Sequence, residues 1–372
     1  MIDIRWTELT LGLSLLFNIS FFLYVIVNFR RSVVSPLWQN TRPNKWLLLF
    51  SFLLIIFVSP GSSSDWYSYQ DLVWNYDLTP GATNHGEPIY RHIVSLVNQN
   101  YLLFRIIVWG GAFLLSCMVF NRMGINTNVA VYFLISVFLL RFNYARATLA
   151  MASYFQGLSL LLKPNKNRRV LSFLLAALFL WGAYEFHISM LPVLLLTIVA
   201  FLPLDKPYVL IPLLVFLPIL ATYISNHFYF IDLLEDETIV NSFNRYSERE
   251  GVTSNIMGII ANIIMYGAFV IPIIVTTLIV ASFNKQIDVY IKRLYRVTIS
   301  IALFASSFLF MEFQSLIFVY RFLFMTFIPI TVICVYLYQN RMMSKPVFSF
   351  VVLWGVLSNM QPLFTGLYHL IR

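Results

Sequence analysis

The chain has 372 residues, of which 59% are hydrophobic and only 11% are charged, and its formal net charge is +9. Soluble domains carry about 25% charged residues, so this composition excludes a string of soluble domains. The sequence also lacks the ligand spacings of zinc sites and the glycine-rich loops that bind nucleotide phosphates. It therefore predicts an all-α, polytopic transmembrane helical bundle with no cofactor.

Long apolar runs follow one another along the whole chain. A hydrocarbon core about 30 Å thick is crossed by about 20 mostly apolar helical residues. On this basis we predict about twelve spans in a single integral membrane domain, residues 1–372. In chain order, the predicted spans are 9–29, 44–60, 101–120, 127–142, 144–162, 170–185, 187–202, 207–225, 256–282, 295–311, 316–338 and 346–367.

The basic residues are distributed unevenly between the connections. With the N-terminus outside, the inner connections hold 16 of the 25 lysines and arginines, but only two of the 16 acids, Asp205 and Asp288. This bias follows the positive-inside rule at every connection. We therefore expect both termini to face outward, and topology rather than nucleic-acid binding explains the basic excess.

The same orientation places two long loops, 61–100 and 226–255, on the outer face. The first contains a dense polar and aromatic stretch, residues 62–91, with four carboxylates and six tyrosines and tryptophans. Long loops in compact proteins are often functional. This loop is expected either to lie on the membrane surface or to form half of an active site.

Nine basic residues lie outside the inner connections, and all nine are arginines. Arginine is preferred over lysine where a planar fork binds phosphate or carboxylate. Arg105, Arg141, Arg146 and Arg321 lie at or within predicted spans, where a central charge costs about 2.5–3.5 kcal/mol. They must face a cavity, pair with a partner or reach the interface. For Arg146 and Arg321 together we favour a functional role over a structural one.

Two acids and a histidine are predicted to lie at the outer ends of spans, at the same membrane depth as these arginines. Glu185 and His187 fall where an outer hairpin turns, and Glu312 and Gln314 fall at another turn. Such a histidine is either a structural hydrogen-bonding group or a group that transfers protons near neutral pH. These residues and the arginines converge on an outward-facing cavity for an anionic, membrane-borne substrate.

Five segments, spread over about residues 60–330, share a pattern with a known family. They are "SDWYSYQDLVW", "EPIYRHIVSLV", "NYARATLAMASYF", "FHISMLPVLLL" and "YRFLFMTFIPI". In this order they resemble the EpsG-type branch of the bacterial Wzy-like polysaccharide polymerases. Two departures from the family pattern are "SSSD", where Gly-Thr-Asp is common, and Ile89, where glycine is common.

The resemblance implies a membrane glycosyltransferase with a GT-C-like fold. Such an enzyme joins oligosaccharide repeat units carried on undecaprenyl pyrophosphate into O-antigen, capsule or exopolysaccharide, at the outer face of the bacterial cytoplasmic (inner) membrane. It implies catalysis without metal, because arginines stabilise the pyrophosphate leaving group. The expected partners are the lipid-linked oligosaccharide, membrane lipid and a chain-length regulator protein.

The resemblance also implies roles for individual residues. His187 or Asp65 would be the catalytic base, and the other candidates would bind substrate. Aromatic residues of the first loop have a second interpretation, as an interfacial belt. The expected substrate-binding residues are Arg146, Arg321, Arg141, Arg105, Glu87, Tyr90, Tyr69, Trp66 and Glu185.

Three alternatives stay open. One is an O-antigen ligase, although ligases typically carry one much larger outer loop. Another is a different glycosyltransferase that uses lipid-linked sugars. The third is a carrier for an anionic solute or a lipid-linked glycan, which is expected to place its charges near the middle of the membrane between broken helices.

Overall fold

The computed structural model describes residues 6–29, 43–57, 73, 88–139, 142, 145–165, 167–187, 190–202, 256–307, 319 and 322–371. Throughout these residues the secondary structure is helical, and no strand occurs. The all-α prediction is therefore confirmed for the described part of the chain. Helix contacts divide the chain into two compact units, Met1–Leu194 with Thr331–Arg372, and Leu195–Ile330.

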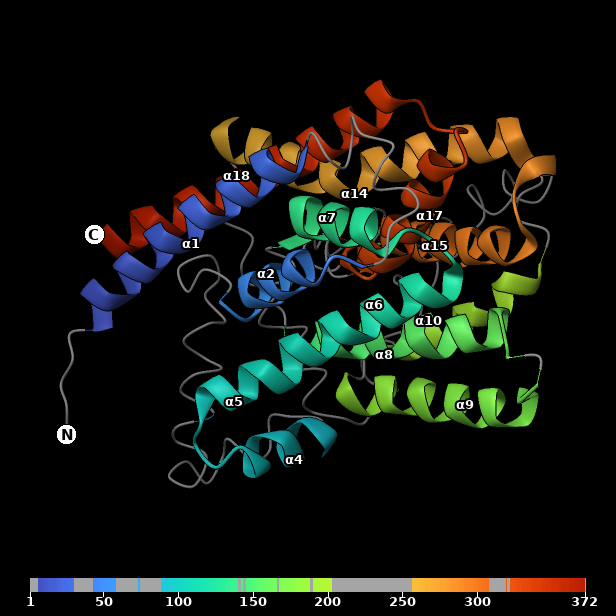
Figure 1. Ribbon diagram of the computed structural model, residues 1–372, viewed down its shortest axis with the longest axis horizontal. Helices are drawn as coiled ribbons and strands as arrows, with labels where there is room; N and C mark the ends of the chain where they lie inside the picture. The colour runs from blue at the N-terminus through green and yellow to red at the C-terminus, as the bar shows by residue number, and fades with distance from the viewer. Residues whose placement is uncertain are drawn as a thin grey trace, which may run out of the picture. The chain divides into compact units, whose positions relative to one another are not determined.

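The helices fall on the predicted spans, apart from 207–225, which lies outside the described residues (Figure 1). α5, η5 and α6 form one continuous helical segment, in which η5 is a π-helix. The elements are α1 (Trp6–Phe29), α2 (Lys45–Ile56), α5 (Tyr101–Arg105), η5 (Ile106–Gly110), α6 (Gly111–Met123), α7 (Thr127–Phe138), α8 (Ala145–Leu162), α9 (Arg169–Phe186), α10 (Met190–Leu196), η7 (Thr197–Phe201), α14 (Ile256–Phe283), η9 (Asn284–Gln286), α15 (Val289–Ser307), α17 (Phe327–Gln339) and α18 (Lys345–Ile371).

Three helical stretches in the described residues are long and apolar enough to cross a membrane: Tyr101–Met123, Arg169–Phe186 and Tyr266–Gln286. Shorter apolar helices, among them Lys45–Ile56 and Thr127–Phe138, accompany them. Many large apolar side chains are exposed, such as Leu174 at 64% and Leu178 at 56%. These features are those of a membrane protein. The number of crossings and the GT-C-like fold remain predictions.

An additional helix and an earlier helix start distinguish the structure from the predicted spans. The predicted loop 61–100 contains an additional helix, α4 (Pro88–Leu96). Proline favours the first position of a helix, because its missing N–H would have no intrahelical partner there. α15 begins at Val289 rather than near residue 295, so that Lys292 and Arg293 lie in its first turns and not in a loop.

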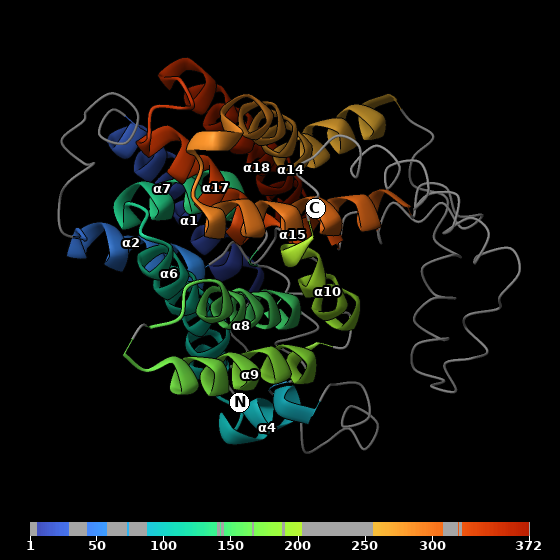
Figure 2. The same ribbon diagram turned by 90° about the vertical axis from the view of Figure 1, so that its right-hand side faces the viewer.

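α7 and α8 form the centre of the first unit. Residues 128–139 and 148–160 are buried without interruption, as expected of helices surrounded by others on all sides. Figure 2 shows α8 beside α6 and α9, with α4 against the other side of α9. Small residues allow such close packing: a Cβ on Gly157 would lie 3.0 Å from the carbonyl oxygen of Ala176.

α18 packs against α7 and α1 in the first unit (Figure 1). A Cβ on Gly355 would lie 2.6 Å from the side chain of Val137, so that only glycine fits this crossing. One turn along α18, Nδ2 of Asn359 donates to the carbonyl oxygen of Ser136 over 2.9 Å. A polar contact between apolar helices fixes their relative position within a membrane.

Hydrogen bonds join the helix ends that the sequence predicts to be cytoplasmic. The Asn44 N–H donates to Oδ1 of Asn128 over 2.7 Å, and the Asn126 N–H donates to Oε1 of Gln339 over 2.9 Å. Nearby, Nη1 of Arg122 donates to the carbonyl oxygen of Lys163 over 3.3 Å. The helix ends at these predicted inner connections are therefore linked pair by pair.

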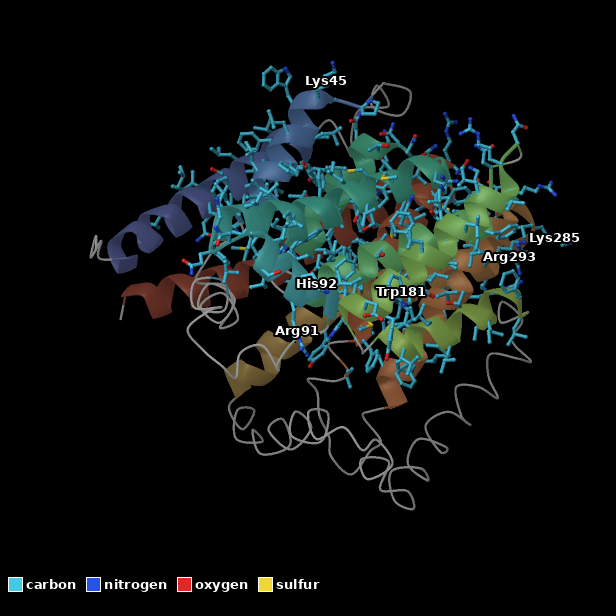
Figure 3. The ribbon with its side chains drawn as sticks, turned by 90° about the horizontal axis from the view of Figure 1, so that it is seen from below. Lys45, Arg91, His92, Trp181, Lys285 and Arg293 are labelled. Carbon is cyan, nitrogen blue, oxygen red and sulfur yellow. The ribbon has the colours of Figure 1, made fainter. Side chains whose placement is uncertain are left out.

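The second unit places its basic residues at the corresponding predicted connection. Nη1 of Arg296 donates to the carbonyl oxygen of Ala200 over 3.3 Å, and the guanidinium of Arg293 lies 5.0 Å from the ring centre of Phe201. Figure 3 shows Lys285 and Arg293 near the turn that joins α14 to α15. Pro272 lies inside α14, where its carbonyl accepts a 2.7 Å bond from Oγ1 of Thr276.

Candidate functional site

Arg105 is the predicted site residue whose surroundings the structure describes most fully. Its side chain is only 5% exposed, although it belongs to a helix long and apolar enough to cross a membrane. The guanidinium carbon lies 5.7 Å from the ring centre of Tyr101 and 5.4 Å from that of Trp109. Aromatic faces attract a cation, more strongly where water is excluded. This packing keeps a planar, charged group in an apolar helix.

The helix changes its winding directly after Arg105. Residues Ile106–Gly110 form a π-helix, a widened turn that inserts one extra residue and often occurs at functional sites. Within it, the indole Nε1 of Trp109 donates to the carbonyl oxygen of Phe142, and the Trp109 ring packs edge-on against Phe104 at 5.8 Å. Trp109 thus contacts Arg105 and also anchors the segment between α7 and α8.

The packing of α6 on α8 relates Arg105 to Arg146. A Cβ on Gly111 would lie 3.7 Å from the side chain of Leu149, and further along both helices Arg122 bonds to Lys163. The two helices are therefore parallel. Arg105 lies six residues before Gly111, and Arg146 lies three residues before Leu149, so the backbones of the two arginines are at the same end of this parallel pair, within about one turn of each other along the helix axis.

The packing of α8 on α9 adds Glu185 and His187 to the same level. Oγ of Ser153 donates to the carbonyl oxygen of Phe179 over 2.8 Å, and Gly157 lies against Ala176. These contacts define an antiparallel pair. Continuing the register by about two turns brings Arg146 level with the end of α9, where His187 lies.

The chain turns at His187, as the sequence predicts. Its N–H donates to the carbonyl oxygens of Ala183 and Tyr184, over 3.2 and 3.1 Å, and caps α9. Its own carbonyl accepts a 2.9 Å bond from the N–H of Met190, where α10 begins. The side chains of Glu185 and His187 are half-buried. The Arg105 guanidinium, the carboxyl group of Glu185 and the imidazole of His187 therefore lie at one end of the first unit, as does the backbone of Arg146.

Some residues near this end were not among the candidates. α4 packs against α9 and carries Arg91, which is half-buried, and His92, which is exposed (Figure 3). Tyr101 and Trp109 were also missed. They stand four residues before and after Arg105, a spacing that places side chains on one face of a helix. That spacing was the signal available in the sequence.

Other candidates lie partly or wholly beyond what the structure describes. For Arg146 and Tyr90 the helical backbone is described but the side chain is not, so their contacts stay predictions. The predicted approach of Arg146 to Arg321 likewise stays a prediction. The candidates outside the described residues are Asp65, Trp66, Tyr69, Glu87, Arg141 and Arg321. Among the described side chains, no group of three His, Cys, Asp or Glu residues is arranged to hold a metal ion.

The family model described as "EpsG family" matches residues 45–362, which extend from the start of α2 into α18 and include every candidate residue. No curated protein and no solved structure gives a significant match to the chain.

Proposed function

Since the chain belongs to the EpsG family, we propose that it is a membrane glycosyltransferase that polymerises oligosaccharide repeat units carried on undecaprenyl pyrophosphate. The product is O-antigen, capsule or exopolysaccharide. The reaction takes place at the outer face of the cytoplasmic membrane, where the predicted orientation puts the candidate site. A chain-length regulator protein is the proposed partner in the membrane.

The proposed reaction transfers the growing glycan from its lipid carrier to the non-reducing end of an incoming lipid-linked unit. A hydroxyl oxygen of the incoming unit forms a bond to the anomeric carbon of the growing chain. The bond from that carbon to the pyrophosphate oxygen breaks, and the pyrophosphate leaves with the electron pair. The hydroxyl proton passes to a base, His187 or Asp65. Each linkage therefore releases one undecaprenyl pyrophosphate.

Arginines supply the electrostatic part of this proposal. Fixed cations directed at a developing negative charge are usually a large catalytic contribution, and a guanidinium binds two phosphate oxygens at once. In the proposal, Arg105, Arg146, Arg141 and Arg321 bind the pyrophosphate, so that no metal ion is needed. The loop residues Asp65, Trp66, Tyr69, Glu87 and Tyr90 hold the sugars, and Glu185 orients His187.

The observation that carries the proposal is the position of Arg105. It is a buried arginine packed between two aromatic rings, at the same end of the first unit as the backbone of Arg146 and the Glu185–His187 turn. A charge is costly at membrane depth and is retained there mainly where it serves a substrate or a partner. An anionic, lipid-borne substrate fits a site of this kind.

The test is chain extension by the purified full-length protein in liposomes. Lipid-linked repeat units should be converted into a ladder of longer lipid-linked glycans, with and without a divalent-metal chelator. A protein that moves the units across the bilayer without joining them would be a carrier. One that transfers them only to a different acceptor lipid would be a ligase. Either result would overturn the proposal.

A further inference from the structure

A second polar site lies at the opposite end of the first unit. A cavity of about 350 Å³ opens between the end of α6, the end of α8 and the turn into α9. Two cations and three amides contribute to its wall, and no carboxylate is among the described residues that line it. The lining residues are Met118, Asn121, Arg122, Gln156, Lys163, Pro164 and Asn165.

One of the two cations of this cavity, Arg122, is held in place by a hydrogen bond to the backbone. Arg122 donates from Nη1 to the carbonyl oxygen of Lys163, which fixes the guanidinium at the end of α8. Among the described residues, its Nε is buried and has no hydrogen-bond acceptor. A buried donor without an acceptor is costly. An anion in the cavity would supply one.

Other groups near the cavity add to its positive electrostatic potential. The ammonium of Lys163 lies 3.3 Å from the position of a Cβ on Gly124, a glycine with a φ of 76° that ends α6 in the left-handed conformation. Four residues after the lining residue Asn165, α9 begins at Arg169 without a side-chain cap, and its uncapped N-terminal amides carry a partial positive charge. Gln156, which is only 1% exposed, forms a buried part of the cavity wall.

The apolar surface beside the cavity indicates what carries the anion. Leu114 and Met118 stand one turn apart on α6 and are 56% and 50% exposed, and Met118 also lines the cavity. An exposed apolar strip therefore leads directly into a cationic pocket. An amphiphile with an acyl chain and an anionic head group fits this combination better than a free ion does.

We propose that this cavity binds the phosphate head group of an anionic phospholipid of the inner leaflet, with the acyl chain along Leu114 and Met118. The cytoplasmic location follows from the predicted orientation. The site lies away from the candidate active site, so the proposal does not depend on the polymerase reaction. Bound lipid would hold together the ends of α6, α8 and α9, which carry the candidate site at their other ends.

Native mass spectrometry of the full-length protein in detergent tests the proposal, with phosphatidylglycerol, phosphatidylcholine and inorganic phosphate as probes. The wild-type protein should retain phosphatidylglycerol in preference to phosphatidylcholine. Lys163→Gln keeps the backbone carbonyl that Arg122 binds, so the fold should persist, yet the phosphatidylglycerol affinity should fall about tenfold, as expected for a lost charge-assisted contact. Arg122→Gln should have a similar effect.

The matched control is Lys45→Gln, which also removes one positive charge at a predicted inner helix end. Lys45 lies at the start of α2 (Figure 3) and is not part of the cavity lining. It should leave lipid retention unchanged. Equal loss in Lys45→Gln and Lys163→Gln, or no loss in Lys163→Gln, would overturn the proposal. Saturable binding of inorganic phosphate that displaces phosphatidylglycerol at equal concentration would assign the cavity to a soluble anion instead.

Discussion

At the residue scale, the predicted outer half of this chain uses guanidinium groups where it needs positive charge. Arg105 shows why an ammonium would not replace them, since its planar group packs between the rings of Tyr101 and Trp109. A guanidinium presents a planar fork of N–H donors, which an ammonium does not. We expect the other arginines of the proposed site to act through the same fork.

The first prediction concerns Arg146. Arg146→Lys keeps the charge but loses the bidentate fork, so chain extension should fall about tenfold or more, with normal protein abundance. The matched control is Arg169→Lys, an exposed position at the predicted inner end, which should retain full activity. Wild-type polymer levels in Arg146→Lys would indicate that this arginine is structural.

The second prediction concerns the base. If His187 accepts the hydroxyl proton, His187→Ala should lower single-turnover extension by about 10²–10⁴-fold while lipid-linked substrate still binds. Asp65→Asn should then be the milder variant, because Asp65 would only hold sugar hydroxyls. Normal extension by His187→Ala together with an inactive Asp65→Asn would reverse the assignment. The histidine would then serve only to close the turn after α9.

At the element scale, the π-helix η5 links Arg105 to the segment before α8. Its Trp109 donates to the Phe142 carbonyl, and Phe142 lies between Arg141 and Arg146 in the sequence. The widened turn is therefore joined directly to the segment that precedes α8. Functional sites are a frequent location for such π-helical turns.

The third prediction follows from this link. Trp109→Phe keeps an aromatic ring beside Arg105 but removes the indole N–H, whose net contribution is about 0.5–1.5 kcal/mol. Extension should fall by up to about tenfold, and the loss should be in kcat because the reacting groups are misaligned while substrate contacts remain. Trp181→Phe is the control, since Trp181 is 57% exposed on α9 (Figure 3). Equal behaviour of the two variants would contradict a positioning role.

The sequence predicted the positions of the long helices better than it predicted the π-helix η5 or the short helix α4. Apolar runs indicated where helices lie, because membrane helices must bury long apolar stretches, and the turn at His187 was placed correctly. The π-helix could not be predicted, because an inserted residue leaves no mark in an evenly apolar run. α4 was not among the predicted spans, because its nine residues are too short and too polar to cross a membrane.

At the whole-molecule scale, the distribution of charge predicts which helix ends lie on the same side of the membrane. The structure is consistent with this pairing in the first unit, where Asn44 bonds to Asn128 and Asn126 bonds to Gln339. Arg105 and His187 lie toward the other end, because α6 and α8 are parallel and α9 is antiparallel to α8. Their proximity could not be predicted from spacing alone, since it depends on the register of α6, α8 and α9.

The fourth prediction tests the orientation. Ser95→Cys, exposed on α4, should react with an impermeant thiol reagent in cells whose cytoplasmic membrane is intact and accessible to it, and Asn167→Cys, exposed between α8 and α9, should react only after lysis. The parent chain is the background control, because Cys117 and Cys334 lie within apolar helices. Labelling of Asn167→Cys before lysis would reverse the orientation and remove the candidate site from the outer face.

The central claim, that the protein joins lipid-linked units, is tested most directly by counting products of a single reaction. Purified wild-type protein is given defined undecaprenyl-pyrophosphate-linked repeat units, and both new glycosidic linkages and released undecaprenyl pyrophosphate are measured. The account predicts one lipid pyrophosphate released for each linkage, with both quantities reduced together in Arg146→Lys. New linkages without release of lipid pyrophosphate, or release without linkages, would contradict it.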